Sequence, residues 1–319
     1  MSFIRSAIAA IAVSLVLVPA AGLAETRVTL KSAKTGSSYY QMAVQLSEAV
    51  KRGSEGALIL TVEESQGSVQ NVMEVAARSG NYVFTTPPAL VGAAAAATGP
   101  FKDKGNPRFA EIRALFPIPS LTMHFVVDAD AGVSDLAGLA GKTILLGKGS
   151  FGATEGEKYL ELFGLKDRVT IADAELSNAV AALKNGQIDA FVTAGSWPAP
   201  NVVEAAAGTG VTVLSLSEDE VAATKRTRTL IPAGTYAGQG ADIVTTSLPV
   251  VTYATTDMDE ATAYALTRTF WEERARMAGE AAWWTGVDAG LLASIDGKIH
   301  PGALKYYDEA GMPVAEANR

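Results

Sequence analysis

The segment 27-RVTLKSAKTGSSYYQMAVQLSEAVKRG-53 decides the fold of this chain. Residues 27–33 alternate apolar and polar side chains, which predicts a strand. A short loop of small residues follows. Residues 39–53 then place Met42, Leu46 and Val50 on one side of a helix. A strand that runs directly into an amphipathic helix is typical of α/β proteins.

The same alternation continues beyond residue 53. A strand is predicted at 57–65, a helix at 68–80 with Ser68 as N-cap, and a strand at 82–86. Because consecutive parallel strands are joined by right-handed crossovers, this β-α-β-α-β series predicts a parallel sheet.

A second α/β series follows without a low-complexity linker. The pattern predicts strands at 111–118, 121–129, 142–147, 168–175, 188–194, 211–217 and 250–255, and helices at 133–141, 154–164, 176–186, 198–208 and 259–278. A Gly/Pro-rich loop is predicted at 231–243, and shorter helices around 289–295 and 303–311. Two such series predict an α/β fold of two lobes that share a cleft. We expect lobe 1 to comprise 25–124 and 245–319, and lobe 2 to comprise 125–244.

The composition excludes several classes of protein. The 319 residues are 48% hydrophobic and 19% charged, which is typical of a globular chain long enough for two domains. The net charge of −8, without a basic cluster, argues against nucleic acid or an anionic membrane as the main partner. The chain has no cysteine, so disulfides, thiol catalysis and zinc–thiolate sites are excluded.

Histidine is also scarce. With only His124 and His300, a histidine metal cluster is not expected, and a Ser-His-Asp triad would need one of the two. His124 lies within the apolar run 121-LTMHFVV-127, which favours a structural histidine. No G-x-S-x-G motif is present, and 147-GKGSFG-152 lacks the G-K-[ST] spacing of a Walker A loop. We therefore predict no catalytic residues, no metal and no cofactor.

The first 24 residues predict a cleavable secretory signal peptide. Arg5 precedes an apolar run that ends in small residues, with Gly22 and Ala24 as the small pair before a cleavage site after Ala24. An uncleaved membrane anchor is the alternative, but the apolar run is short for a spanning helix. The leader predicts export to the periplasm.

Three strand-to-helix junctions share one character: 35-TGSSYY-40, 65-SQGSVQN-71 and 147-GKGSFGATE-155. Each ends a strand with glycine and hydroxyl side chains and opens a helix. Ligands of open α/β sheets bind at the carboxyl ends of the strands, and helix N-termini favour anions. Three converging junctions predict an anion pocket, whereas capping and turn chemistry alone would explain any single one.

Several of these stretches resemble one family. Together with the leader, 35-TGSSYYQ-41, 65-SQGSVQNV-72, 186-GQIDAFVTAG-195, 231-IPAGTYAGQ-239 and 299-IHPGALKYYDEAGM-312 resemble the TAXI solute-binding proteins, in order and over nearly the whole mature chain. These are the periplasmic receptors of one branch of the TRAP transporters.

The resemblance implies a two-lobe, Venus-flytrap fold that holds a small organic acid, such as glutamate or a related dicarboxylate, and delivers it to a TRAP membrane permease. It implies no catalysis. Two departures from the family pattern concern the ligand. Ser37 and Gln41 replace a glycine and a proline of the usual first loop, and the loop at 147–155 is longer and carries Lys148 and Phe151.

The position of each motif implies a set of ligand-binding residues. In lobe 1 these are Thr35, Gly36, Ser37, Ser38, Tyr39, Gly67, Ser68, Val69, Thr85 and Thr86; in lobe 2 they are Lys148, Ser150, Phe151, Thr154, Thr193, Ala194, Gly195 and Trp197. Lys148 is the expected direct countercharge, with a solvated lysine at the cleft rim as the alternative. Tyr39 and Trp197 are expected to be exposed loop aromatics that wall the pocket.

Three hypotheses of function remain open at this point. The leading one is a monomeric periplasmic receptor whose partners are a small organic anion and the TRAP permease subunits. A ligand sensor that reports to a membrane kinase would have the same sequence features. An exported hydrolase on the same scaffold would need an acid–base pair or nucleophile in the cleft.

Overall fold

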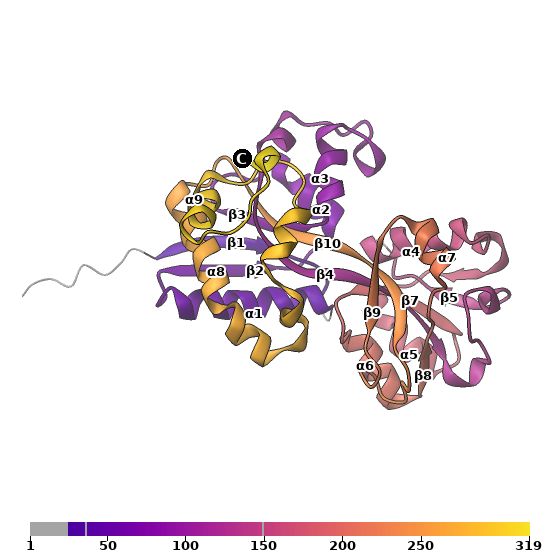
Figure 1. Ribbon diagram of the computed structural model, residues 1–319. Coiled ribbons are helices and arrows are strands. Elements are labelled where there is room, and N and C mark those ends of the chain that lie inside the picture. Colours follow the sequence, from indigo (N-terminus) through magenta and orange to yellow (C-terminus); the bar gives the residue numbers. More distant parts are fainter. Residues whose placement is uncertain (1–24, 36, 149) are drawn as a thin grey trace, which may run out of the picture.

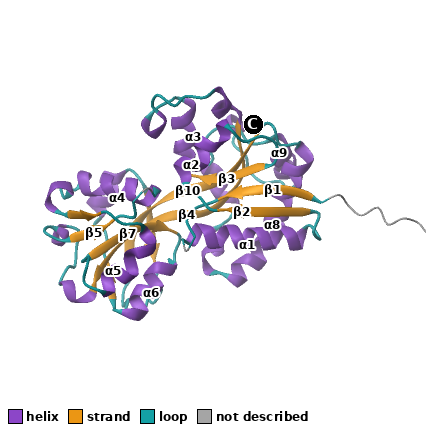
Figure 2. Ribbon diagram, turned by 180° about the vertical axis from the view of Figure 1, so that it is seen from behind, coloured by secondary structure: helices purple, strands orange, loops and turns teal. Residues whose placement is uncertain are grey.

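The computed structural model describes residues 25–35, 37–148 and 150–319. The predicted signal peptide at 1–24 and the predicted ligand contact at Gly36 lie outside these residues. Figures 1 and 2 show two α/β lobes, with the long strands β4 and β10 running from one lobe into the other. No helix of the described part is long and apolar enough to cross a membrane.

The strands are β1 (Thr26–Lys31), β2 (Leu58–Glu63), β3 (Tyr82–Thr86), β4 (Ile112–Asp128), β5 (Thr143–Leu145), β6 (Thr170–Ala172), β7 (Ala190–Gly195), β8 (Val211–Val213), β9 (Thr227–Ile231) and β10 (Ile243–Thr255). The helices are α1 (Ser38–Gly53), α2 (Ser68–Met73), α3 (Pro88–Ala95), α4 (Phe151–Leu162), α5 (Ala179–Lys184), α6 (Pro200–Gly208), α7 (Glu218–Thr224), α8 (Glu260–Glu280) and α9 (Pro301–Glu309), with short 3-10 turns between them.

The strands form one sheet in the order β2-β1-β3-β10-β4-β7-β5-β6, with β8 paired to β4 and β9 to β10. The expected parallel series is confirmed, because β1 pairs in parallel with both β2 and β3. Strands β5, β6 and β7 are also parallel. Among the described strands, every antiparallel pair contains a crossing strand: β4 pairs in this way with β10, β7 and β8, and β10 with β3 and β9. The predicted lobe boundaries, at 124/125 and 244/245, fall inside these two crossing strands and stay a prediction.

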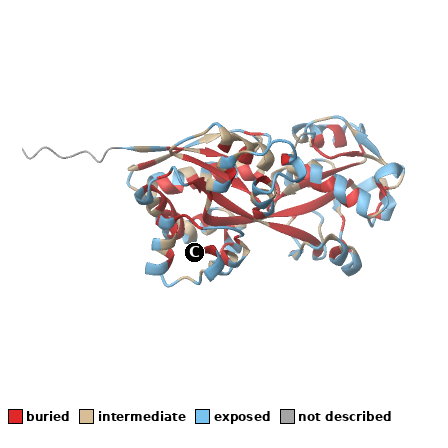
Figure 3. Cartoon of the chain, turned by 90° about the horizontal axis from the view of Figure 1, so that it is seen from above, coloured by how far each residue is buried: buried red, intermediate tan, exposed pale blue. Residues whose placement is uncertain are grey.

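Helix α1 illustrates how the pattern becomes packing. Met42, Leu46 and Val50 are buried against the sheet as predicted, and Lys51 and Arg52 occupy the last turn, where a cation complements the helix dipole. Buried residues follow the sheet through both lobes, and exposed residues lie on the outer helices and loops (Figure 3).

Several strand predictions were wrong in extent, and those at 168–175 and 211–217 are the three-residue strands β6 and β8. The strands expected at 111–118 and 121–129 are one strand, β4. Pro117 and Pro119 lie within β4, but they precede Thr122, where pairing with β7 begins, so the missing N–H groups interrupt no ladder on that side. The strand expected at 250–255 is the end of the longer β10, whose partner β9 was not predicted.

Two helix predictions also need correction. The helix expected at 68–80 is the six-residue α2 followed by a 3-10 turn at Glu74–Ala76. Its N-cap is Gly67 and not Ser68. The helix expected at 133–141 is a single 3-10 turn, Ala137–Leu139.

Candidate functional site: a cavity between the lobes

A cavity of about 570 Å³ lies between the lobes. A volume of this size suits a small molecule. The cavity is formed where strands of both lobes end and helices begin. Its wall is lined by Ser32, Ala33, Lys34, Thr35, Ser37, Ser38, Tyr39, Gln41, Glu64, Gln66, Gly67, Ser68, Thr85 and Leu121, and by Gly147, Lys148, Ser150, Phe151, Gly152, Glu175, Leu176, Ser177, Val180, Thr193, Ala194, Ala199, Pro200, Asn201, Glu204 and Val250.

The hydroxyl of Ser37, in the first junction, both donates and accepts a hydrogen bond within its own loop. Ser37 is the N-cap of α1, and its Oγ accepts from the Tyr40 N–H at 3.2 Å. The same hydroxyl donates to the Lys34 carbonyl at 2.7 Å. Ser37 therefore shapes the loop, and its proton is already committed to the protein backbone.

Tyr39 differs from the expected exposed loop aromatic. It lies in the first turn of α1, is only 7% exposed, and donates its hydroxyl to the Pro119 carbonyl of β4 at 2.7 Å. Burial raises the pKa of Tyr39, so the phenol stays protonated and keeps this bond. Tyr39 does line the cavity, as a fixed wall attached to the crossing strand.

The lobes touch beside this junction. Ser38 Oγ accepts from the Ser196 N–H at 3.3 Å, which joins α1 to the end of β7. A Cβ added at Gly195 would lie 2.5 Å from Ser38 Oγ. Gly195 was predicted to contact ligand, but it does not line the cavity; its lack of a side chain lets the two lobes meet.

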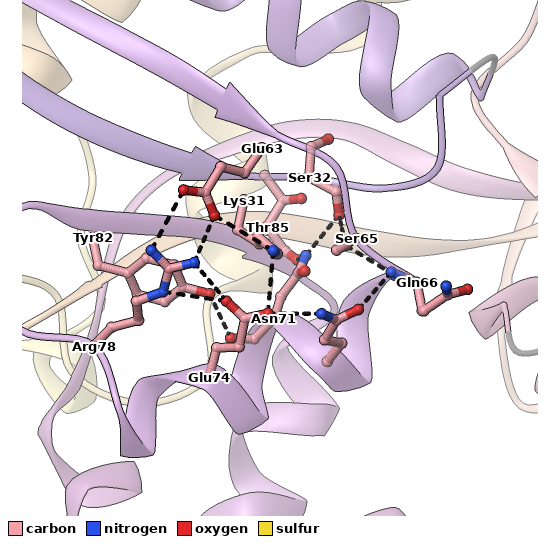
Figure 4. A network of polar contacts seen from close by, with 12 residues as sticks. Lys31, Ser32, Glu63, Ser65, Gln66, Asn71, Glu74, Arg78, Tyr82 and Thr85 are labelled. Carbon is pink, nitrogen blue, oxygen red and sulfur yellow. Dashed lines mark hydrogen bonds and ion pairs between the residues drawn. The ribbon is translucent and has the colours of Figure 1, made fainter.

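A polar network holds the second junction in place (Figure 4). Asn71 is fully buried and donates to the carbonyls of Ser32 and Thr85, which ties together the ends of β1 and β3. Ser65 Oγ donates to the Ser32 carbonyl and accepts from the Gly67 N–H. Gly67 has φ 110°, a conformation that favours glycine.

The same network continues away from the cavity into a cluster of charges. Lys31 Nζ lies 3.2 Å from Glu74 and 3.5 Å from Glu63, and Arg78 bonds both carboxylates. The hydrogen bond from Arg78 is the main cause that holds the pKa of Glu63 below its ordinary value. Gln70 links Glu74 to the Gln66 N–H, so the charged cluster supports the loop that lines the cavity.

The lobe 2 junction repeats the capping geometry of the first. Ser150 is the N-cap of α4, and its Oγ accepts from the Ala153 N–H at 3.0 Å. Phe151 is half-buried and lies against lobe 1, since it lines a small groove together with Gln66 and Met73 of that lobe. Val69 and Thr154, both predicted contacts, line a side groove next to Phe151 and not the main cavity.

The strand ends contribute two hydroxyls, one from each lobe. Thr85 is the penultimate residue of β3 and Thr193 lies near the end of β7; both line the cavity and are 6% and 4% exposed. Thr86 and Trp197, predicted with them, do not line the cavity. Thr86 is fully buried because neighbouring residues of a strand face opposite sides, and Trp197 packs on the lobe 2 core.

Lys148 lies at the cavity wall but is not a free countercharge. Its Nζ pairs with Asp173 at 2.7 Å, and its side chain is 66% exposed. Lys34 pairs in turn with Glu175 at 3.2 Å, across the mouth between the lobes. Glu64 accepts from the Thr35 N–H, and this bond holds the pKa of Glu64 below its ordinary value.

His124 has a supporting role at the lobe 2 wall. Its ring is fully buried, with Nδ1 3.1 Å from the Thr122 carbonyl and Nε2 2.8 Å from the Tyr236 hydroxyl. Because a carbonyl only accepts, Nδ1 carries the proton and Nε2 accepts from Tyr236. The Tyr236 hydroxyl also accepts from the Ala199 N–H, so this chain of bonds ends at the start of α6. The expectation of a satisfied structural histidine is confirmed.

The part of the wall built by α5, α6 and the turn before α5 was not predicted from the sequence. These segments contribute Glu175, Leu176, Ser177, Val180, Ala199, Pro200, Asn201 and Glu204. One signal was available: 195-GSWPAP-200 is a further strand-to-helix junction, with Pro200 at a first helical position.

Several solved structures share this architecture. The periplasmic binding protein BugD is similar over 91% of this chain and 99% of its own, with TM-score 0.58 and 12% identity. A protein from Bordetella bronchiseptica RB50 matches over 93% and 86%, with TM-score 0.51 and 16% identity. MatC from Rhodopseudomonas palustris, solved with bound malate, matches over 84% and 88%, with TM-score 0.51 and 14% identity.

At such identities these likenesses show the fold, which is the two-lobe α/β fold of periplasmic binding proteins. A family model provides the link at the level of sequence, since it matches residues 30–311. The chain therefore belongs to the NMT1-like family.

Proposed function

We propose that this protein is an extracytoplasmic solute-binding protein that captures a small organic anion and delivers it to a membrane permease. The observation that carries the proposal is the cavity between the lobes, with the capped starts of α1 and α4 on its opposite sides. Both helices are long enough for their N-terminal N–H groups to favour an anion. Binding between two lobes would stabilise the closed arrangement by a population shift.

The ordered motifs that resemble TAXI proteins support a TRAP-type permease as the partner, and glutamate and dicarboxylates as the first candidates. The leader-like sequence at 1–24 supports a periplasmic location after cleavage. We also propose that the protein acts as a monomer, without catalysis, and that its lobes comprise 25–124 with 245–319, and 125–244.

A thermal-shift screen tests the proposal. The mature chain, residues 25–319, is heated with organic acids, amino acids and sulfonates, and in parallel with neutral sugars and polyamines. A ligand that binds only the folded state raises the melting temperature, so we expect at least one acid to do so and the sugars and polyamines not to. A shift by neutral or cationic solutes alone would contradict the proposal.

A pair of isosteric variants locates the binding. Thr193→Val removes a hydroxyl from the cavity wall, and Thr212→Val makes the same change on the exposed face of β8. We expect the first variant to reduce the ligand-induced shift and the second to leave it unchanged. Equal shifts in both variants would place the ligand elsewhere.

A further inference from the structure

Both cationic side chains on the cavity wall form ion pairs within the protein. The charged residues that line it are Lys34, Lys148, Glu64, Glu175 and Glu204, two cations against three anions. Lys34 is paired with Glu175 and Lys148 with Asp173. No arginine lines the cavity within residues 25–35, 37–148 and 150–319. The wall therefore offers no free cationic side chain to a ligand.

Neutral donors remain, and they gather where the lobes meet. The starts of α1 and α4 face the cavity, and the backbone nitrogen of Phe151 lies close to Gly67 of the opposite lobe. Thr85 and Thr193 add hydroxyls that form no hydrogen bond with the described residues. Although little of either residue is exposed, both line the cavity and neither hydroxyl oxygen is sealed from it. A polar ligand group in the cavity can therefore bond to them.

One part of the wall is apolar, although the neutral polar residues Gln41, Gln66, Ser177 and Asn201 also line the cavity. Leu121 and Val250 come from the crossing strands, Leu176 and Val180 from the segment around the start of α5, and Ala199 and Pro200 from the start of α6. A carboxylate placed against these side chains would lose its hydration without gaining a cation, which is unfavourable. An apolar group there would gain from leaving water.

From this distribution we infer that the ligand is a singly charged acid with an apolar body, and not a dicarboxylate. The inference rests on the proposed function and narrows its ligand class. The acid group is held by helix N–H groups and the two threonine hydroxyls, and the body packs on Leu176, Val180 and Pro200. This differs from the malate that MatC was solved with, and from the dicarboxylates that the TAXI resemblance implies.

Calorimetric titration of two acids of similar size tests the inference. We expect 4-methylpentanoate to bind at least about tenfold more tightly than glutarate, a ratio that corresponds to about 1.4 kcal/mol. Tighter binding of glutarate would overturn the inference and leave the proposed function standing. If neither acid nor any other anion binds, the inference and the anion-binding function both fail.

A variant pair makes the test independent of the ligands chosen. Val180→Lys places a cation on the apolar wall, and Val203→Lys places the same cation on the exposed face of α6, outside the cavity. We expect Val180→Lys to strengthen glutarate binding about tenfold and to weaken 4-methylpentanoate binding, while Val203→Lys changes neither. Strengthened glutarate binding in both variants would overturn the assignment of this wall. Should Val180→Lys fail to fold, the titration of the unaltered protein decides.

Discussion

The two lobes begin their cavity-facing helices in the same way but hold them differently. Ser37 and Ser150 both accept from the N–H three residues ahead, at 3.2 and 3.0 Å, and both donate their own N–H to the carbonyl three residues behind. After the cap the lobes diverge. Tyr39 is buried and bonded to the crossing strand β4, whereas Phe151 is half-buried and faces the opposite lobe.

This difference separates two functions of one local motif. The serine cap specifies where a helix starts. The aromatic residue that follows determines which part of the protein packs against the start of that helix. In lobe 1 the edge of the cleft is held by Tyr39 and by the neutral amide of Asn71. In lobe 2 the start of α6 depends on His124, which can be protonated. The predictions below test this contrast.

Acid should weaken lobe 2 before lobe 1. Burial lowers the pKa of His124 from its ordinary 6.5 to about 4. Between these values the unfolded chain binds the proton and the folded protein does not, so the free energy of unfolding falls as the pH drops. At 1.36 kcal/mol per unit, this loss is roughly 3 kcal/mol by pH 4. Urea unfolding of the wild type and of His124→Gln at a series of pH values should show a flatter profile for the variant.

His300→Gln is the matched control in lobe 1, since burial lowers the pKa of His300 as well. Hydrogen exchange adds a local measurement: acid should speed exchange in α6 before α1. The proposed difference between the lobes would be contradicted if acid accelerated hydrogen exchange equally in α6 and α1. It would also be contradicted if His124→Gln left the pH dependence of the free energy of unfolding unchanged.

Closing the cleft should depend on Gly195. In Gly195→Ala the new methyl group would meet Ser38 Oγ of the other lobe, and relieving such a contact costs about 1–3 kcal/mol. Because opening of the lobes would relieve the contact in the free protein but not in the ligand-bound one, we expect ligand affinity to fall about tenfold or more, with less change in the urea midpoint. The double variant Gly195→Ala/Ser38→Ala removes the obstructing oxygen and should regain most of the affinity. A double variant no better than Gly195→Ala would show that the lobes do not approach here.

The hydrogen bond between Tyr39 and β4 should contribute to the free energy of unfolding. Tyr39→Phe leaves the buried Pro119 carbonyl without its donor, which should cost about 1–2 kcal/mol in urea unfolding. Phe151→Leu, the matched change in lobe 2, should cost less than about 1 kcal/mol, because that side chain is only half-buried and forms no side-chain hydrogen bond. The reverse order would contradict the proposed difference between the lobes.

The smallest effect should come from the ion pair across the mouth. Lys34 and Glu175 are partly exposed, so their pairing should contribute roughly 0.2–1 kcal/mol and weaken with salt. A double-mutant cycle of Lys34→Gln and Glu175→Gln, read out as ligand affinity at low and high salt, measures it. Lys148→Gln and Asp173→Asn form the matched cycle, because that pair lies within lobe 2 and should not affect closure. Equal coupling energies in both cycles would show that the Lys34–Glu175 pair does not stabilise the closed arrangement of the lobes.

Sequence pattern alone predicted the elements that depend on local periodicity. The strand and the helix of the opening segment, and the three strand-to-helix junctions, follow from side chains a few residues apart. Strand β9 and the first half of β10 were missed because 245-TTS-247 has the composition of a loop. In the fold, Thr245 donates to the Met123 carbonyl, Thr246 pairs with Tyr159, and Ser247 pairs with Thr229. Their burial depends on distant partners that no local pattern contains.

The candidate site also has features that the sequence pattern predicts and features that depend on distant contacts. Loops with glycine and serine at strand ends were identified, and Thr35, Ser38, Gly67, Thr85, Ser150 and Thr193 do line one cavity. The hydrogen-bond partner of each hydroxyl could not be predicted from the sequence. Ser37 donates its hydroxyl proton to the Lys34 carbonyl, and Ser38 accepts a hydrogen bond from Ser196 of the other lobe. The wall at Leu176, Val180 and Pro200 has ordinary apolar residues, whose role depends only on where the lobes place them.

The position of β10 in the sheet has a consequence for the order of folding. This strand lies between β3 and β4, yet it is made of residues Ile243–Thr255. Until that segment is available, β2-β1-β3 and β4-β7-β5-β6 are two separate sheets with open edges. Such long-range closure favours slow folding, and exposed edges invite pairing with other chains. A chain that ends before Ile243 should therefore aggregate rather than form a smaller stable protein.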